Sequence, residues 1–128
     1  MGRPVVEVLL DSVILIDHFN GIAAATEYLT QVNEEAAISV ITRAEVLAGF
    51  DEEEAVALAA QVLDCFACLI LDKPIADRAA VLRRREGWKL PDAMQAAIAQ
   101  HHGLKLATRN HRDFSPQKYP FVVMPYTV

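Results

Sequence analysis

Hydrophobic positions follow two patterns along the chain, short apolar runs and longer segments with helical spacing. A nearly continuous apolar run predicts a strand that is covered on both faces, as in a parallel sheet. Such runs occupy Val5–Leu10, Ala36–Val40, Ala67–Leu71, Leu104–Ala107 and Phe121–Met124. Apolar residues three or four positions apart predict helices. These segments are Ile14–Phe19, Ile22–Val32, Thr42–Phe50, Ala55–Phe66, Ile75–Arg85 and Asp92–His101, with a single turn at His111–Phe114.

Strands and helices alternate throughout the chain, without repeats, low-complexity tracts or linkers. This alternation predicts parallel strands joined by helical crossovers, with helices on both faces of the sheet. Right-handed crossovers bring the carboxyl ends of the strands to one edge. We therefore expect a single domain over residues 1–128, folded as a three-layer α/β/α sandwich with a mostly parallel central sheet.

Composition narrows the class of protein. A chain of 128 residues that is 53% hydrophobic can bury a sizeable core. Its formal net charge of −5 argues against a nonspecific coat on nucleic acid, but not against a nuclease whose acids bind cations. No apolar stretch approaches the roughly 20 residues of a membrane span, and Met1–Asp11 lacks the apolar region of a secretory signal. We expect a cytoplasmic protein that does not bind membranes.

Four acidic residues stand where the predicted strands end or the next helices begin. Asp11 ends the first strand, and Glu45 lies about one helical turn after the second. Asp92 opens the helix that leads into the fourth strand, and Asp113 lies just beyond that strand. Strand ends meet at one edge of an open sheet, so the four carboxylates are expected to gather there. Mg²⁺ or Mn²⁺ would relieve their repulsion and could promote phosphodiester hydrolysis.

Each acid also has a purely structural interpretation. Asp11 could cap the following helix, and Thr42-x-x-Glu45 has the pattern of a capping box. Asp92 could complement a helix dipole, and Asp113 could form a turn. The argument for a metal site therefore depends on the arrangement of the four acids, not on any one of them.

Three sequence blocks, Leu9–Asp17, Ile38–Gly49 and Leu90–Phe114, resemble a known family in order and spacing. The chain resembles PIN-domain ribonucleases, specifically the VapC-like toxins of type II toxin–antitoxin systems. The resemblance implies an endoribonuclease dependent on Mg²⁺ or Mn²⁺, with the four acids as catalytic metal ligands. It also implies an RNA substrate, a cognate antitoxin that obstructs the site, and a homodimer formed through the helices at Glu45–Phe50 or Ala55–Phe66.

The chain departs from the family pattern in two places. The first motif often reads Asp-Thr-Asn/Ser, whereas here Val13 follows Asp11 and Ser12. Some relatives place an acid nearer Asn110, which leaves Asp113 the least certain ligand. Residues that could support the ligands or contact RNA are Ser12, Thr108, Asn110, Arg43 and Arg109. Asp17 lies further along the first helix and is expected to be structural.

Two further clusters leave alternatives open. Cys65 and Cys68 form a CxxC motif that could be redox-active or half of a zinc site, but we expect both to pack in the interior. Arg83–Arg85, with Trp88 and Lys89, could bind RNA phosphate and stack a base, or could complement a helix C-terminus.

Other functional classes find less support in the sequence. It contains no Gly-rich phosphate loop and no nucleophile elbow around a serine. The alternatives to a ribonuclease are a non-catalytic RNA- or protein-binding module on the same scaffold, and a metal-dependent DNase.

Overall fold

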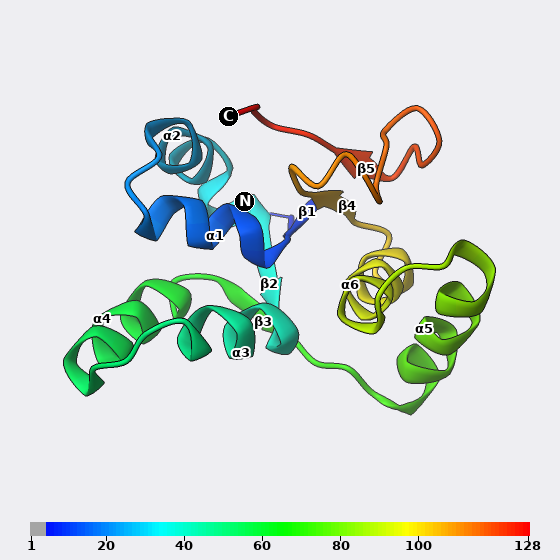
Figure 1. Ribbon diagram of the computed structural model, residues 1–128, viewed down its shortest axis with the longest axis horizontal. Coiled ribbons are helices and arrows are strands. Elements are labelled where there is room, and N and C mark those ends of the chain that lie inside the picture. Colours follow the sequence, from blue (N-terminus) through cyan, green and yellow to red (C-terminus); the bar gives the residue numbers. More distant parts are fainter. Residues whose placement is uncertain (1–4) are drawn as a thin grey trace.

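A five-stranded parallel sheet forms the centre of the molecule in the computed structural model, which describes residues 5–128 (Figure 1). Its strands are β1 (Val8–Leu10), β2 (Ala36–Ser39), β3 (Ala67–Leu69), β4 (Lys105–Ala107) and β5 (Val122–Val123). The strand order is β3-β2-β1-β4-β5, and each of these pairings is parallel. The predicted mostly parallel sheet is therefore confirmed. Residues 1–4, which include part of the segment used to exclude a signal peptide, lie outside the described residues.

Six helices cover the two faces of this sheet. They are α1 (Ser12–Phe19), α2 (Ala23–Val32), α3 (Val40–Ala48), α4 (Glu53–Leu63), α5 (Lys73–Glu86) and α6 (Leu90–His101), with a 3₁₀ turn η1 (Asn33–Glu35). Helices α1 to α4 lie on one side and α5 and α6 on the other, which confirms the predicted three layers (Figure 1). No helix within residues 5–128 is long and apolar enough to cross a bilayer.

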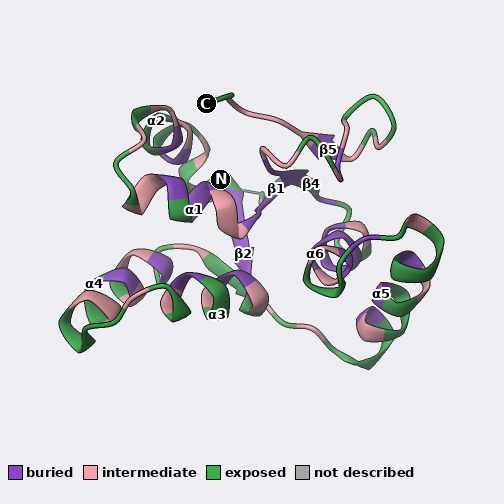
Figure 2. Cartoon of the chain, viewed as in Figure 1, coloured by how far each residue is buried: buried purple, intermediate pink, exposed green. Residues whose placement is uncertain are grey.

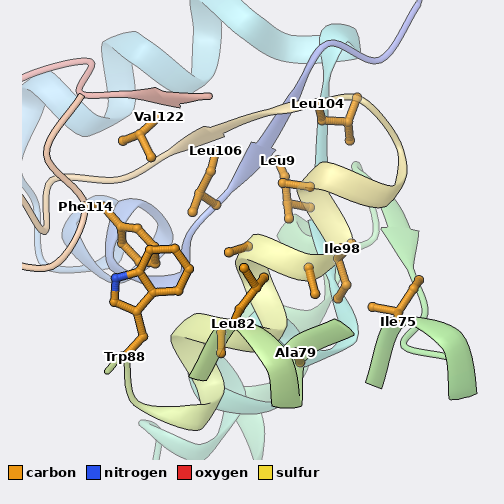
Figure 3. Packing of buried hydrophobic residues seen from close by; sticks show 14 of the residues in the cluster. Leu9, Ile75, Ala79, Leu82, Trp88, Ile98, Leu104, Leu106, Phe114 and Val122 are labelled. Atoms are coloured by element: carbon orange, nitrogen blue, oxygen red, sulfur yellow. The ribbon is translucent and has the colours of Figure 1, made fainter. Parts of the chain in front are cut away.

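The core has two parts, one on each side of the sheet. Leu9 and Leu106 point toward α5 and α6, where they pack with Leu82, Ile98 and Phe114 (Figure 3). The neighbouring strand residues face the opposite way and pack against the other helices. That second cluster includes Leu10, Ile14, Ile38, Val46 and Leu63. Figure 2 shows β1, β2 and β4 buried at the centre, between helices whose outer faces are exposed.

The register of the central strands brings distant residues level at their carboxyl ends. Strand β1 lies between β2 and β4, and Leu10 pairs with Ala107. The Asp11 backbone N–H then donates to the Ala107 carbonyl at 2.9 Å, so Asp11 and Thr108 leave the sheet side by side. This is the edge at which parallel α/β sheets place their chemistry.

The prediction that both cysteines pack in the interior is wrong. Cys65 and Cys68 are exposed free thiols. Cys68 belongs to β3, which is an edge strand, and the first two residues of β3 are exposed. An apolar segment at a sheet edge has only one neighbouring strand and incomplete cover, and sequence composition cannot distinguish it from a central strand.

Candidate active site

Asp11 occupies the junction between β1 and α1 and is only 6% exposed. One carboxylate oxygen accepts a hydrogen bond from the Ser12 N–H at 2.9 Å, and the other accepts one from the Thr108 hydroxyl at 2.8 Å. Asp11 is also the N-cap of α1, so the prediction that it caps the following helix is confirmed. Burial raises the pKa of Asp11 above its ordinary value, and these two hydrogen bonds oppose that rise.

The four predicted acids are coupled electrostatically in a row. Glu45 contributes to the raised pKa of Asp11. Burial raises the pKa of Asp92 to about 6, and the charges of Asp11 and then Asp113 add to the rise. The structure thus links Glu45 to Asp11, Asp11 to Asp92, and Asp92 to Asp113. Hereafter we call these four residues the acidic row.

The acidic row is more open than a closed metal cage. Across residues 5–128, no three acidic, histidine or cysteine side chains lie close enough together to hold a metal ion as a compact group. None of the four acids forms an ion pair within this range. Lys89 is near enough to Asp92 to lower its pKa slightly, although this effect is smaller than those that raise it.

Three consecutive residues after β4 each hold a different aspartate. The Thr108 hydroxyl donates to Asp11, the Arg109 guanidinium donates to Asp17, and the Asn110 amide donates to Asp113 at 3.0 Å. The Thr108 hydroxyl oxygen also accepts the backbone N–H of Asn110 at 3.0 Å. This segment therefore orients two members of the acidic row, which is the supporting role considered for Thr108 and Asn110.

Asp17 is buried and fully engaged by partners distant in the sequence. Arg109 Nη2 donates to it at 2.9 Å, and the Tyr126 hydroxyl donates at 2.8 Å. The hydrogen bond from Arg109 holds the pKa of Asp17 below its ordinary value. These contacts give Asp17 the structural role expected of it.

The two arginines considered as supports for the acids have other partners. Arg109 holds Asp17, and Arg43 pairs with Asp64 on the surface at 2.8 Å. Of the two roles left open for Arg43 and Arg109, support of the metal-binding acids does not match these contacts, and contact with RNA stays a prediction.

The capping-box interpretation of Glu45 is wrong. Helix α3 begins at Val40, because the Ser39 hydroxyl caps it by accepting the Thr42 N–H at 3.1 Å. Thr42 therefore lies inside the helix, and Glu45 lies a turn further on with an exposed side chain. Its carboxylate is not required to cap the helix.

A buried polar network beneath the acidic row was not found from sequence. The Ser39 hydroxyl donates to Gln95 Oε1 at 2.7 Å, and the Gln95 amide donates to the Thr42 hydroxyl. Thr42 in turn donates to the Leu10 carbonyl at 3.2 Å. Gln95 also lowers the pKa of Asp11 slightly. The available signal was Gln95 itself, a polar residue one turn after Asp92 in an alanine-rich helix.

Trp88 cannot stack an RNA base, because it is only 3% exposed. It packs against Phe114 (Figure 3) and against Tyr119. Its indole N–H donates to the Asp113 carbonyl at 3.0 Å. Arg83 donates to the Trp88 carbonyl just beyond the end of α5. The part of the basic cluster formed by Arg83 and Trp88 is therefore structural.

Comparison with known proteins identifies the family. A sequence model of the PIN domain matches residues 8–116. The chain belongs to the PIN domain family. Proteins with this domain are generally nucleases. No curated protein matches the chain significantly.

Solved structures similar to this PIN domain include toxin–antitoxin assemblies. One is a toxin–antitoxin complex from Klebsiella pneumoniae, with a TM-score of 0.88 and 38% identity, covering 95% of this chain and 100% of that one. FitAcB from Neisseria gonorrhoeae has a TM-score of 0.77 and 22% identity, covering 94% of this chain and 99% of that one. DNA-bound VapBC from Salmonella typhimurium has a TM-score of 0.74 and 24% identity, covering 85% of this chain and 90% of that one. The predicted VapC-like resemblance is confirmed.

Proposed function

We propose that this PIN domain is a divalent-metal-dependent endoribonuclease whose metal ligands come from the acidic row. The observation that carries this proposal is the coupled row itself. Asp11 is buried with a raised pKa, and Asp92 has a pKa of about 6. Within the described part of the chain, neither acid is neutralised by an ion pair. Such carboxylates favour a cation supplied from outside the chain.

The open geometry of the acidic row suits Mg²⁺ or Mn²⁺. Mg²⁺ dehydrates reluctantly and is commonly bound by one or two carboxylates plus waters and substrate phosphates, so a compact cage of three protein ligands is not required. Asp11 and Asp92 would bind the ion, with Glu45 and Asp113 on either side. When bound, the ion polarises a phosphate oxygen and makes water more acidic.

The surrounding residues orient these carboxylates. The Thr108 hydroxyl and the Ser12 N–H fix the two oxygens of Asp11, while Asn110 fixes Asp113. At pH 7 Asp92, with its pKa of about 6, is mostly deprotonated and available as a ligand. Preorganised oxygen ligands lower the cost of binding a cation and aligning the phosphate.

We also propose that the protein is the toxin of a toxin–antitoxin pair. The proposal is supported by its 38% identity to a chain of the Klebsiella pneumoniae toxin–antitoxin complex. It predicts that expression restrains growth through RNA cleavage and that a cognate antitoxin relieves this restraint. A homodimer is proposed with it, and Leu58, which is 64% exposed on α4, is an apolar position on one of the two helices expected to form the interface.

The proposed activity is tested with purified protein and labelled RNA and single-stranded DNA of the same sequence. Wild type should cleave RNA with Mg²⁺ or Mn²⁺ and not in EDTA. Asp92→Asn should abolish cleavage, whereas Asp77→Asn should not, because Asp77 is an exposed acid on α5 outside the acidic row. Cleavage of DNA alone would indicate a DNase. RNA binding without cleavage would indicate a non-catalytic module.

A further inference from the structure

A polar cavity of about 170 Å³ lies beside the acidic row, between the end of α5 and the loop that follows β4. The lining includes Glu86, Trp88, Arg112, Asp113, Lys118 and Tyr119. Pockets for whole drug-sized ligands are usually about 300–1,000 Å³, so this cavity suits a fragment such as one nucleotide base.

Asp113 connects the cavity to the acidic row. It lines the cavity, its carboxylate accepts the Asn110 amide at 3.0 Å, and its backbone carbonyl accepts the indole N–H of Trp88. A group bound in the cavity would therefore lie next to a phosphate held at the acidic row.

The cavity carries two exposed cations in a protein whose net charge is negative. Arg112 and Lys118 are both exposed, and neither forms an ion pair within residues 5–128. The Lys118 ammonium lies 5.4 Å from the centre of the Tyr119 ring. With a formal net charge of −5, the protein as a whole repels a polyanion, so local cations beside the acids are needed to hold one.

The cavity lining also includes a packed aromatic cluster and a hydrogen-bond acceptor. Trp88 packs against Phe114 and Tyr119 with ring centres 4.8 and 5.0 Å apart. The Tyr119 hydroxyl donates to Glu86 Oε1 at 2.7 Å, which fixes that carboxylate. A carboxylate has capacity for further donors, and the N4 amino group of cytosine is a suitable one.

We propose that this cavity binds the RNA nucleotide next to the scissile phosphate. Arg112 and Lys118 contact its phosphate, and Glu86 accepts a hydrogen bond from an amino group on its base. The inference rests on the proposed ribonuclease function and adds to it a position that contributes to substrate choice.

The first test measures binding separately from cleavage. Fluorescence anisotropy with a labelled 12-nucleotide random-sequence RNA is recorded in EDTA over a range of salt concentrations. Arg112→Ala and Lys118→Ala should each weaken binding and reduce the slope of log affinity against log salt by about 0.7, the value for one phosphate contact with a single strand. Lys73→Ala, which removes an exposed lysine at the other end of α5, is the matched control and should leave the slope unchanged.

The second test concerns the base. Wild type should bind labelled oligocytidine about tenfold more tightly than oligouridine, a difference of about 1.4 kcal/mol at the lower end of the range for a good base contact. Glu86→Gln should remove most of this preference, because the amide presents a donor as well as an acceptor. An unchanged preference in Glu86→Gln would overturn the placement of the base.

The outcomes separate this inference from the proposed function. If wild type binds and cleaves RNA while Lys118→Ala and Arg112→Ala keep the wild-type salt slope, the cavity is not a phosphate site and the ribonuclease proposal stands. If wild type neither binds RNA in EDTA nor cleaves it with Mn²⁺, both proposals are wrong. Urea unfolding of each variant shows whether the protein remains folded.

Discussion

Asp11 caps the start of α1 and Asp17 lies in its last turn; both are buried, yet their surroundings shift their pKa values in opposite directions. Asp17 receives a guanidinium and a tyrosine hydroxyl, and its pKa is lowered. Asp11 receives neutral donors, chiefly the Thr108 hydroxyl and the Ser12 backbone N–H, and burial raises its pKa. A carboxylate that already has a cationic partner stabilises the fold, whereas one held only by neutral donors can bind an external cation.

The largest expected effect comes from neutralising Asp11. Asp11→Asn should slow RNA cleavage roughly a thousandfold or more, because metal-assisted stabilisation of a transition state is worth several kcal/mol. Without metal, the variant should be as stable as wild type or more stable at pH 7, since a neutral amide avoids burying a charge. Cleavage rates and urea unfolding measure the two effects. A fully active variant would refute the assignment of Asp11 as a ligand.

Neutralising Asp17 should instead lower the stability of the protein and leave the cleavage rate nearly unchanged. Asp17→Asn should lower the free energy of unfolding by about 3 kcal/mol, the lower end for a broken buried ion pair, because Arg109 is partly exposed. The cleavage rate of the folded fraction should change little. Because the folded pKa is lowered, the contribution of Asp17 is complete above its ordinary pKa of 3.8 and is lost as pH falls through the folded pKa.

A surface pair provides the control for Asp17. Asp64→Asn removes the exposed Arg43–Asp64 ion pair and should cost less than about 1 kcal/mol. Equal losses of unfolding free energy for Asp17→Asn and Asp64→Asn would show that burial does not make the Asp17 pair more stabilising than a surface pair.

Divalent metal should stabilise the protein through the acidic row alone. At pH 7.5, Mn²⁺ at a hundred times its Kd should add about 2.7 kcal/mol to the free energy of unfolding. At pH 5 the gain should be much smaller, because Asp92, with a pKa of about 6, holds a proton that competes with the ion. Thermal unfolding with and without Mn²⁺ measures this gain, which should shrink in Asp92→Asn and persist in Asp17→Asn.

Without metal, the contribution of Asp92 makes the protein less stable, not more stable, as pH rises. Its folded pKa is raised from 3.8 to about 6, so the folded state retains the proton over a range in which the unfolded chain has lost it. The resulting stability is fully present below 3.8 and is lost as pH rises through about 6. Asp92→Asn should flatten this part of the metal-free profile. A profile identical to that of wild type would contradict the raised pKa.

Thr108 supports Asp11 without binding metal itself, so its loss should reduce activity less than the loss of Asp11 does. Thr108→Val removes the hydroxyl that donates to Asp11 and should slow cleavage by about 10–100-fold, as is typical for partners of metal ligands. Thr108→Ser retains the hydroxyl and should keep most of the activity. Steady-state kinetics of the two variants give the comparison, and equal rates would show that this hydrogen bond is dispensable.

Sequence patterns predicted the layers of the fold because these depend on local order along the chain. They also pointed to the four candidate acids, because the strand ends of a parallel sheet meet at one edge. Each strand is a short apolar run, and each acid follows a strand or opens a helix. The helix boundary at α3 was missed because Ser39 and Thr42 are both good N-caps, and only the end of β2 decides between them.

Contacts between residues that are distant in the sequence could not be predicted from local patterns. Arg109 and Tyr126 meet Asp17 only after the chain has crossed the sheet, and nothing near Asp17 in the sequence indicates them. For the same reason the burial of Trp88 depends on Phe114 and Tyr119, which lie far along the chain, and the exposure of Cys68 depends on β3 being an edge strand. These choices belong to tertiary packing, not to local propensity.

The central position of β1 has a consequence for when activity can arise during folding. Asp11 enters the chain early, but its donor Thr108 lies 97 residues later, and Tyr126 lies 109 residues after Asp17. Closing loops of this length costs entropy that local contacts do not repay, so these contacts form late. A nascent chain that has not yet paired β4 with β1 lacks Thr108 and Asp113 at the site. With the proposed ribonuclease activity, the chain should therefore not cleave nearby RNA until most of it has been synthesised.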